Sequence, residues 1–132
     1  MAELGCECIP FARAEDGATS APVSVIAFVQ PWFGPSQMAV RQLLSAGPAC
    51  GVDVFFVDAD QEALKAHQLG IWGSPAMLFY ARGCQLTIQR PEVDDATKYI
   101  GSITMEELES LLRQARECLT SSNTILRAGA HH

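Results

Sequence analysis

The chain contains 132 residues, 48% of them hydrophobic, and carries a formal net charge of −6. This length suits one domain, since domains usually contain about 100–150 residues. The apolar runs are too short to cross a membrane. The acidic balance argues against direct nucleic-acid binding, which needs clustered Lys and Arg.

The five cysteines are an odd number without the spacing of a zinc site. We therefore expect no metal or other cofactor, and reduced thiols in an intracellular protein of the cytoplasm or nucleus. The N-terminal residues lack a basic region followed by an apolar one, so no secretion signal is expected.

The first half of the chain alternates strand and helix signals. Residues 1–22 mix Gly, Pro, Ala, Ser and charged residues without a period, which predicts an irregular lead-in to a domain over residues 23–120. The run VSVIAFV, residues 23–29, predicts a strand buried on both faces. A helix is expected over residues 35–46, and a second buried strand over residues 52–57.

The second half is expected to complete the domain with a helix, a hairpin and another helix. Asp60 is expected to cap a short helix that Gly70 closes. The segments AMLFYA and CQLTIQR, joined by Arg82-Gly83, predict a hairpin. Thr104 begins a capping-box pattern before a helix with apolar residues at helical spacing. Residues 121–132 are expected to form a flexible tail.

This order of elements resembles the thioredoxin-like fold, an α/β fold with a central mixed β-sheet flanked by helices. Thioredoxins carry Trp-Cys-Gly-Pro-Cys after a strand and, further along the chain, a Gly-Ile-x-x-x-Pro segment whose proline is cis. This chain has WFGPS at residues 32–36 and GIWGSP at residues 70–75, in the same order. The resemblance covers about residues 23–119.

The resemblance implies that the residues of the redox chemistry are missing. Phe33 stands where thioredoxins have the attacking cysteine, Ser36 where they have the resolving cysteine, and Ala27 where they have a buried aspartate. Disulfide exchange needs a thiolate nucleophile and a second thiol. A hydroxyl without an activating base cannot replace a thiol. We therefore predict no catalytic residue at this motif, and a binding module in place of an enzyme.

The groove beside the cis-proline is the candidate binding site. In thioredoxins the backbone before this proline pairs with an extended peptide, so a protein partner with an extended segment is expected here. Trp32, Phe33, Trp72, Ser74 and Pro75 would form the binding face, with a cis bond between the last two. The alternative is that Trp32 and Pro75 are only fold residues and that Trp72 packs under the loop.

A further resemblance concerns residues 90–119, which contain the segment TKYIGS. This region is similar to the spliceosomal thioredoxin-like proteins of the Dim family, which lack the paired thiols. That resemblance implies a protein-binding component of a ribonucleoprotein, with a role in pre-mRNA splicing. The acidic residues Glu92, Asp94 and Asp95 are either a solvated loop or a docking site for a basic partner.

Another function stays open on the sequence alone. A thiol-disulfide oxidoreductase or redox-sensing protein could use Cys6 and Cys8, or Cys84, in place of the motif. No cysteine pair has the C-x-x-C spacing at a helix start that would support this alternative. Oligomeric state is not indicated by any pattern.

Overall fold

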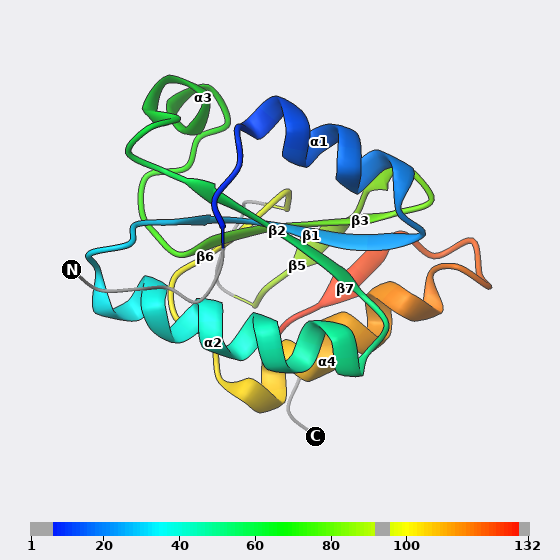
Figure 1. Ribbon diagram of the computed structural model, residues 1–132. Coiled ribbons are helices and arrows are strands. Elements are labelled where there is room, and N and C mark those ends of the chain that lie inside the picture. The colour runs from blue at the N-terminus through cyan, green and yellow to red at the C-terminus, as the bar shows by residue number, and fades with distance from the viewer. Residues whose placement is uncertain (1–6, 92–95, 130–132) are drawn as a thin grey trace.

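A computed structural model describes residues 7–91 and 96–129 and shows a β-sheet between two layers of helices (Figure 1). The helices are α1 (Phe11–Ser20), α2 (Gly34–Ala49), α3 (Ala63–Gln68) and α4 (Met105–Glu117). The strands are β1 (Val23–Val29), β2 (Asp53–Asp58), β3 (Ala76–Ala81), β4 (Cys84–Gln85), β5 (Thr87–Gln89), β6 (Tyr99–Ile100) and β7 (Ile125–Arg127).

The main sheet is mixed and is built around β1. β1 pairs with β2 in parallel and with β3 antiparallel, and the sheet continues from β3 to β4 in the order β2-β1-β3-β4. β6 also pairs with β3, at the end where β3 begins. β5 and β7 form a separate parallel pair. The expected mixed sheet flanked by helices is therefore confirmed.

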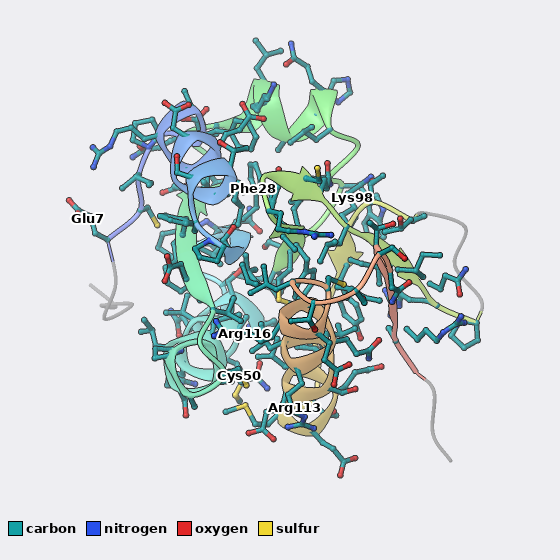
Figure 2. All side chains as sticks on the ribbon, turned by 90° about the vertical axis from the view of Figure 1, so that its right-hand side faces the viewer. Glu7, Phe28, Cys50, Lys98, Arg113 and Arg116 are labelled. Atoms are coloured by element: carbon teal, nitrogen blue, oxygen red, sulfur yellow. The ribbon has the colours of Figure 1, made fainter. Side chains whose placement is uncertain are left out.

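Side chains alternate along β1 between two apolar cores. Val25, Ala27 and Val29 belong to the core that α2 and α4 cover. Ile26 and Phe28 belong to the core that α1 and α3 cover. Figure 1 shows these helix pairs on opposite faces of the sheet, and Figure 2 shows Phe28 next to α1. A strand buried on both faces explains why the sequence here is apolar without alternation.

The prediction of an irregular lead-in over residues 1–22 was wrong where the structure describes it. Residues 11–20 form α1, whose buried side chains are Phe11, Ala14 and Ala18. Their spacing places them on one helix face. The ring of Phe11 lies 5.6 Å from that of Phe28, so α1 is part of the domain core.

The prediction of a flexible tail over residues 121–132 was wrong for β7. Leu126, in the middle of this strand, is fully buried. The predicted hairpin is only partly formed, because the antiparallel pairing of β3 stops after the two residues of β4. β5 then pairs with β7 in place of continuing along β3.

The helix caps also differ from the sequence predictions. The residue before α3 is Glu62, not Asp60, and it provides no side-chain cap. Thr104 caps α4 by accepting a hydrogen bond from the backbone N–H of Glu107 at 3.1 Å. The carboxylate of Glu107 accepts hydrogen bonds from Tyr99 and from the backbone of Gly129, so only half of the capping box is formed. No helix among residues 7–91 and 96–129 is long and apolar enough to cross a membrane.

Candidate functional site

The motif loop joins β1 to α2. Its backbone turns at Gln30, whose carbonyl accepts a hydrogen bond from the Phe33 N–H at 3.0 Å. Phe33 is the N-cap residue of α2 and has extended backbone angles. The Phe33 side chain is half-buried, and its ring centroid lies 5.5 Å from that of Trp32. The two aromatic side chains therefore form one contiguous apolar surface at the start of α2.

Ser36 links this loop to the segment before Pro75. Its side chain is fully buried, and its hydroxyl accepts a hydrogen bond from the Gln30 N–H at 3.0 Å. The same hydroxyl lies 3.1 Å from Ser74 Oγ, to which it donates. Ser74 Oγ in turn donates to Gln30 Oε1 at 2.5 Å. Ser36 is thus held by neutral partners, without a base that could activate it.

The segment from Trp72 to Ser74 has an unpaired backbone within the described part of the chain. No backbone hydrogen bond joins these three residues to another described residue. The residues on either side are hydrogen-bonded to the rest of the fold. The Ile71 N–H donates to the Ala66 carbonyl, and the Gly101 N–H donates to the Pro75 carbonyl. The bond between Ser74 and Pro75 is cis. An extended segment could therefore pair with residues 72–74 without displacing a bond.

Asp60 is the ionisable group of the site. Its carboxylate accepts hydrogen bonds from Trp32 Nε1 at 2.8 Å and from Gln30 Nε2 at 2.9 Å. These two bonds, that from Trp32 first, lower the pKa of Asp60 below its ordinary value, and burial opposes them only slightly. The carboxylate is therefore ionised at neutral pH.

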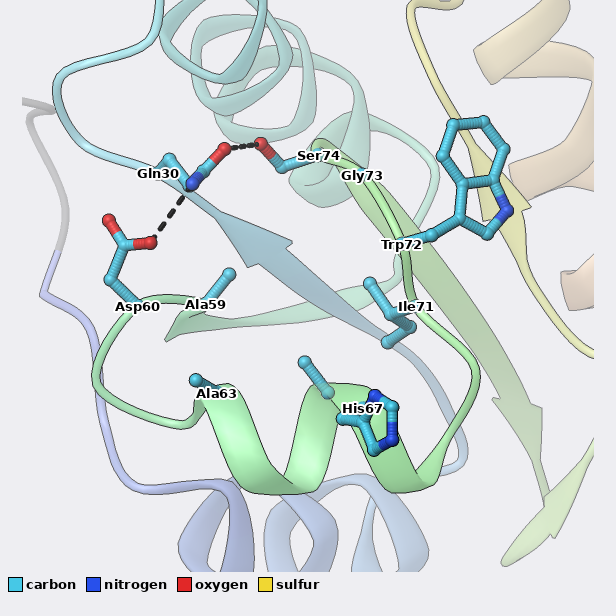
Figure 3. Close-up of a pocket in the computed structure, with 10 residues that line it drawn as sticks. Gln30, Ala59, Asp60, Ala63, His67, Ile71, Trp72, Gly73 and Ser74 are labelled. Carbon is cyan, nitrogen blue, oxygen red and sulfur yellow. Dashed lines mark hydrogen bonds between the residues drawn. The ribbon is translucent and has the colours of Figure 1, made fainter.

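A pocket of about 200 Å³ lies between this network and α3. Figure 3 shows Gln30, Asp60 and Ser74 on one side of it and the α3 residues Ala63 and His67 on the other. The remaining lining residues are Ala59, Ala66, Ile71, Trp72 and Gly73. Polar atoms thus line one wall, and mainly apolar side chains line the opposite wall.

Several solved structures with a similar arrangement of elements are thioredoxins. A mutant thioredoxin from Halobacterium salinarum superposes with a TM-score of 0.68 at 19% identity, over 83% of this chain and 88% of that one. Chloroplastic thioredoxin z superposes with a TM-score of 0.67 at 18% identity, over 84% of this chain and 94% of that one. Mitochondrial thioredoxin 3 from Saccharomyces cerevisiae superposes with a TM-score of 0.62 at 19% identity, over 79% of this chain and 89% of that one.

The chain has a thioredoxin fold. Its sequence matches no protein-family model, and no curated protein is significantly similar to it. The identities to these three thioredoxins are below 25%, so this similarity establishes the fold alone.

Ala27 lies beneath the motif loop within this thioredoxin fold. It is fully buried in the core covered by α2 and α4 and pairs with Phe56 on β2 and Met77 on β3. The side chain of Ala27 is a methyl group and both paired residues are apolar, so none of the three offers a group for proton transfer.

The predicted binding residues do not all face the same way. Pro75 is buried, whereas Trp32 is 66% and Trp72 is 83% exposed. The alternative that Trp72 packs under the loop is therefore wrong. Figure 3 shows the Trp72 indole pointing away from Gln30 and Asp60. Gln30 connects two of the predicted residues, because its carbonyl accepts from the Phe33 N–H and its side-chain Oε1 accepts from the Ser74 hydroxyl. The Trp32 ring contacts the Phe33 ring, whereas the Trp72 side chain lies apart from them.

The other candidate residues lie apart from this site or outside the described residues. Cys50, Cys84 and Cys118 are free thiols. Cys84 is exposed on β4, whereas burial raises the pKa of the Cys118 thiol. Residues 7–91 and 96–129 contain no cluster of three metal-ligating side chains. Cys6 and the acidic residues Glu92, Asp94 and Asp95 lie outside the described residues.

Proposed function

We propose that this chain is a redox-inactive binding module with a thioredoxin fold, which holds an extended segment of a partner protein beside Pro75. The observation that carries the proposal is the segment of residues 72–74. Hydrogen bonds with Ser36 and Gln30 hold the side chain of Ser74 in place. The backbone groups of residues 72–74 have no hydrogen-bond partner among the described residues. Strand addition by a peptide uses unpaired backbone groups of this kind.

The residues of the motif support binding without disulfide exchange. Phe33 has no nucleophilic atom, and the hydroxyl of Ser36 is buried and bonded to Gln30 and Ser74. A nucleophilic hydroxyl needs an adjacent base, and none contacts Ser36 among the described residues. The geometry favours a scaffold role for Ser36.

Exposed apolar side chains support the same proposal. Trp32, Met38, Leu64 and Trp72 are each more than half exposed, and they lie on the motif loop, α2, α3 and the segment before Pro75. These elements surround one end of the sheet (Figure 1). Large exposed apolar side chains near one end of a molecule favour a protein-binding surface there.

The resemblance of residues 90–119 to the Dim family extends the proposal to the kind of partner. A component of an assembly such as a ribonucleoprotein would bind proteins and leave RNA to other subunits. The net charge of −6 agrees with this division of roles, since phosphate binding needs a basic surface. We place such a module inside the cell, in the cytoplasm or nucleus.

A thiol function at another cysteine is the second candidate. The exposure of Cys84 on β4 is the observation in its favour. Cys84 pairs with Ala81, the last residue of β3, whereas Pro75 precedes the first residue of that strand. A thiol reaction there would therefore not use the motif loop, and Cys84→Ser would abolish it.

Phe33→Ala tests the binding role, with Leu44→Ala as its control. Leu44 is an exposed apolar side chain of α2 that borders a different groove. Proteins captured from cell extract by the unmodified chain identify a partner, whose affinity is then measured with each variant. We expect Phe33→Ala to weaken binding by about 1–3 kcal/mol, as for an interface anchor. Equal affinities for both variants would contradict the proposal.

A further inference from the structure

The pocket between Asp60 and α3 has the chemistry of a subsite for one basic side chain. Its volume of about 200 Å³ is below the range of about 300–1,000 Å³ that is common for pockets of drug-sized ligands. It opens directly beside the unpaired segment of residues 72–74, since Trp72, Gly73 and Ser74 line it. A peptide paired with that segment could place one side chain in the pocket.

Asp60 provides a fixed negative charge at the pocket wall. Its hydrogen-bond donors, the Trp32 indole and the Gln30 amide, are neutral groups, so they orient the carboxylate without neutralising it. Each carboxylate oxygen can accept a second hydrogen bond. Asp60 is exposed, and among the described residues no cation contributes to its pKa.

The opposite wall suits the aliphatic part of a long side chain. Ala63 and Ala66 of α3 and the buried Ile71 line it. Lysine and arginine characteristically lay their methylene groups along apolar surface and keep the charged head in a polar region. A cation also complements the net charge of −6.

We propose that this pocket receives a lysine or arginine side chain of the bound segment, with its cationic head at Asp60 and its methylene groups along α3. This inference rests on the proposed function, because it names the residue type that the same site selects. It predicts a partner segment that is extended and carries a basic residue.

Three peptides test this selectivity. They are acetyl-Gly-Val-Xaa-Val-Gly-amide with lysine, norleucine or glutamate at Xaa. The Trp32 indole N–H donates to Asp60, so its signal in a ¹H–¹⁵N spectrum reports on the pocket. The chain has two tryptophans, and Trp72→Phe assigns their two indole signals.

We expect the lysine peptide to bind about threefold to fivefold more tightly than the norleucine peptide, in line with the modest strength of exposed ion pairs. The glutamate peptide should bind most weakly. Asp60→Asn should remove the preference. Asp53→Asn is the matched control and should keep it, because Asp53 is exposed at the start of β2 whereas Asp60 follows the end of that strand.

Salt provides a test that needs no variant. Raising the ionic strength should weaken binding of the lysine peptide and leave that of the norleucine peptide nearly unchanged. Equal affinities for the three peptides, or a preference that survives Asp60→Asn, would overturn the inference and leave the proposed function intact. No shift of either indole signal with any peptide would contradict both.

Discussion

At the residue scale, the buried hydroxyl of Ser36 has a structural role. Its hydroxyl accepts from the motif loop and donates to the segment before Pro75, so two loops distant in sequence are joined. A buried hydroxyl without partners would cost free energy, and here the Gln30 backbone N–H and the Ser74 hydroxyl satisfy it. The described chain has no buried side-chain polar atom without a hydrogen bond.

Introducing thiols at positions 33 and 36 tests whether the geometry of the motif loop is suitable for disulfide exchange. We predict that Phe33→Cys combined with Ser36→Cys gains weak disulfide-reductase activity. Position 33 is the N-cap of α2, where the helix N-terminus lowers a thiol pKa. Activity should stay low because Ala27 supplies no acid or base beneath the loop. The measurement is insulin reduction by dithiothreitol, and Phe33→Ser with Ser36→Ala is the inactive control.

A double variant as inactive as this control, while still folded, would show that the loop does not place the two thiols together.

Asp60 gives the site a pH dependence at acidic pH. Its pKa in the folded protein lies below the ordinary value of 3.8, through hydrogen bonds from Trp32 and then Gln30. A lowered folded-state pKa contributes stability that is present above the unfolded pKa and is lost as the pH falls through the folded pKa. The bond between Asp60 and Trp32 should therefore persist at neutral pH and break below pH 3.8.

The fluorescence of Trp32 in a Trp72→Phe background measures this transition. We predict a change in emission below pH 3.8 that Asp60→Asn abolishes. The same transition in the presence of Asp60→Asn would assign it to another carboxyl group.

At the scale of elements, α1 is held against the sheet by a close approach at Gly17. A Cβ atom built at Gly17 would lie 2.6 Å from the Phe55 ring, closer than two carbon atoms can approach. Gly17→Val should therefore destabilise the fold by about 1–3 kcal/mol through overpacking. Ala12→Val, at an exposed position of the same helix, is the control. Urea denaturation compares them, and equal midpoints would show that α1 does not pack closely on β2.

The sequence predicted best those elements whose pattern does not depend on distant partners. The bounds of β1 were predicted correctly, because a strand buried on both faces is a nearly continuous apolar run, in which Ser24 is the one polar residue. The helix α1 was missed because two of its three buried residues are alanines in a segment that also holds Gly, Ser and Thr. β7 was missed because its three residues become a strand only by pairing with β5.

The site was predictable in part for the same reason. The motif residues Trp32, Phe33 and Ser36 were found because they lie within five consecutive residues where a strand is followed by a helix. Asp60 was read as a helix cap, since its position after β2 fits that local role. Its bond to Trp32 spans 28 residues and depends on the parallel pairing of β1 with β2, which brings the ends of both strands together.

At the scale of the whole molecule, an apolar core lies on each face of the sheet. All parts of the proposed binding site lie at one end of this sheet. The motif loop, α3 and the segment before Pro75 meet at that end (Figure 1). The exposed Cys84 lies at the other end of β3. The thioredoxin fold thus separates the proposed binding surface from the thiol that is most accessible among the described residues.

The rate of insulin reduction by dithiothreitol in the presence of the unmodified protein tests the central claim most directly. The account predicts no acceleration over dithiothreitol alone, because Phe33 and Ser36 replace both thiols of the motif and no other pair has its spacing. Sustained acceleration by the folded, unmodified protein would contradict it and would make this chain a thiol-disulfide enzyme that uses another cysteine.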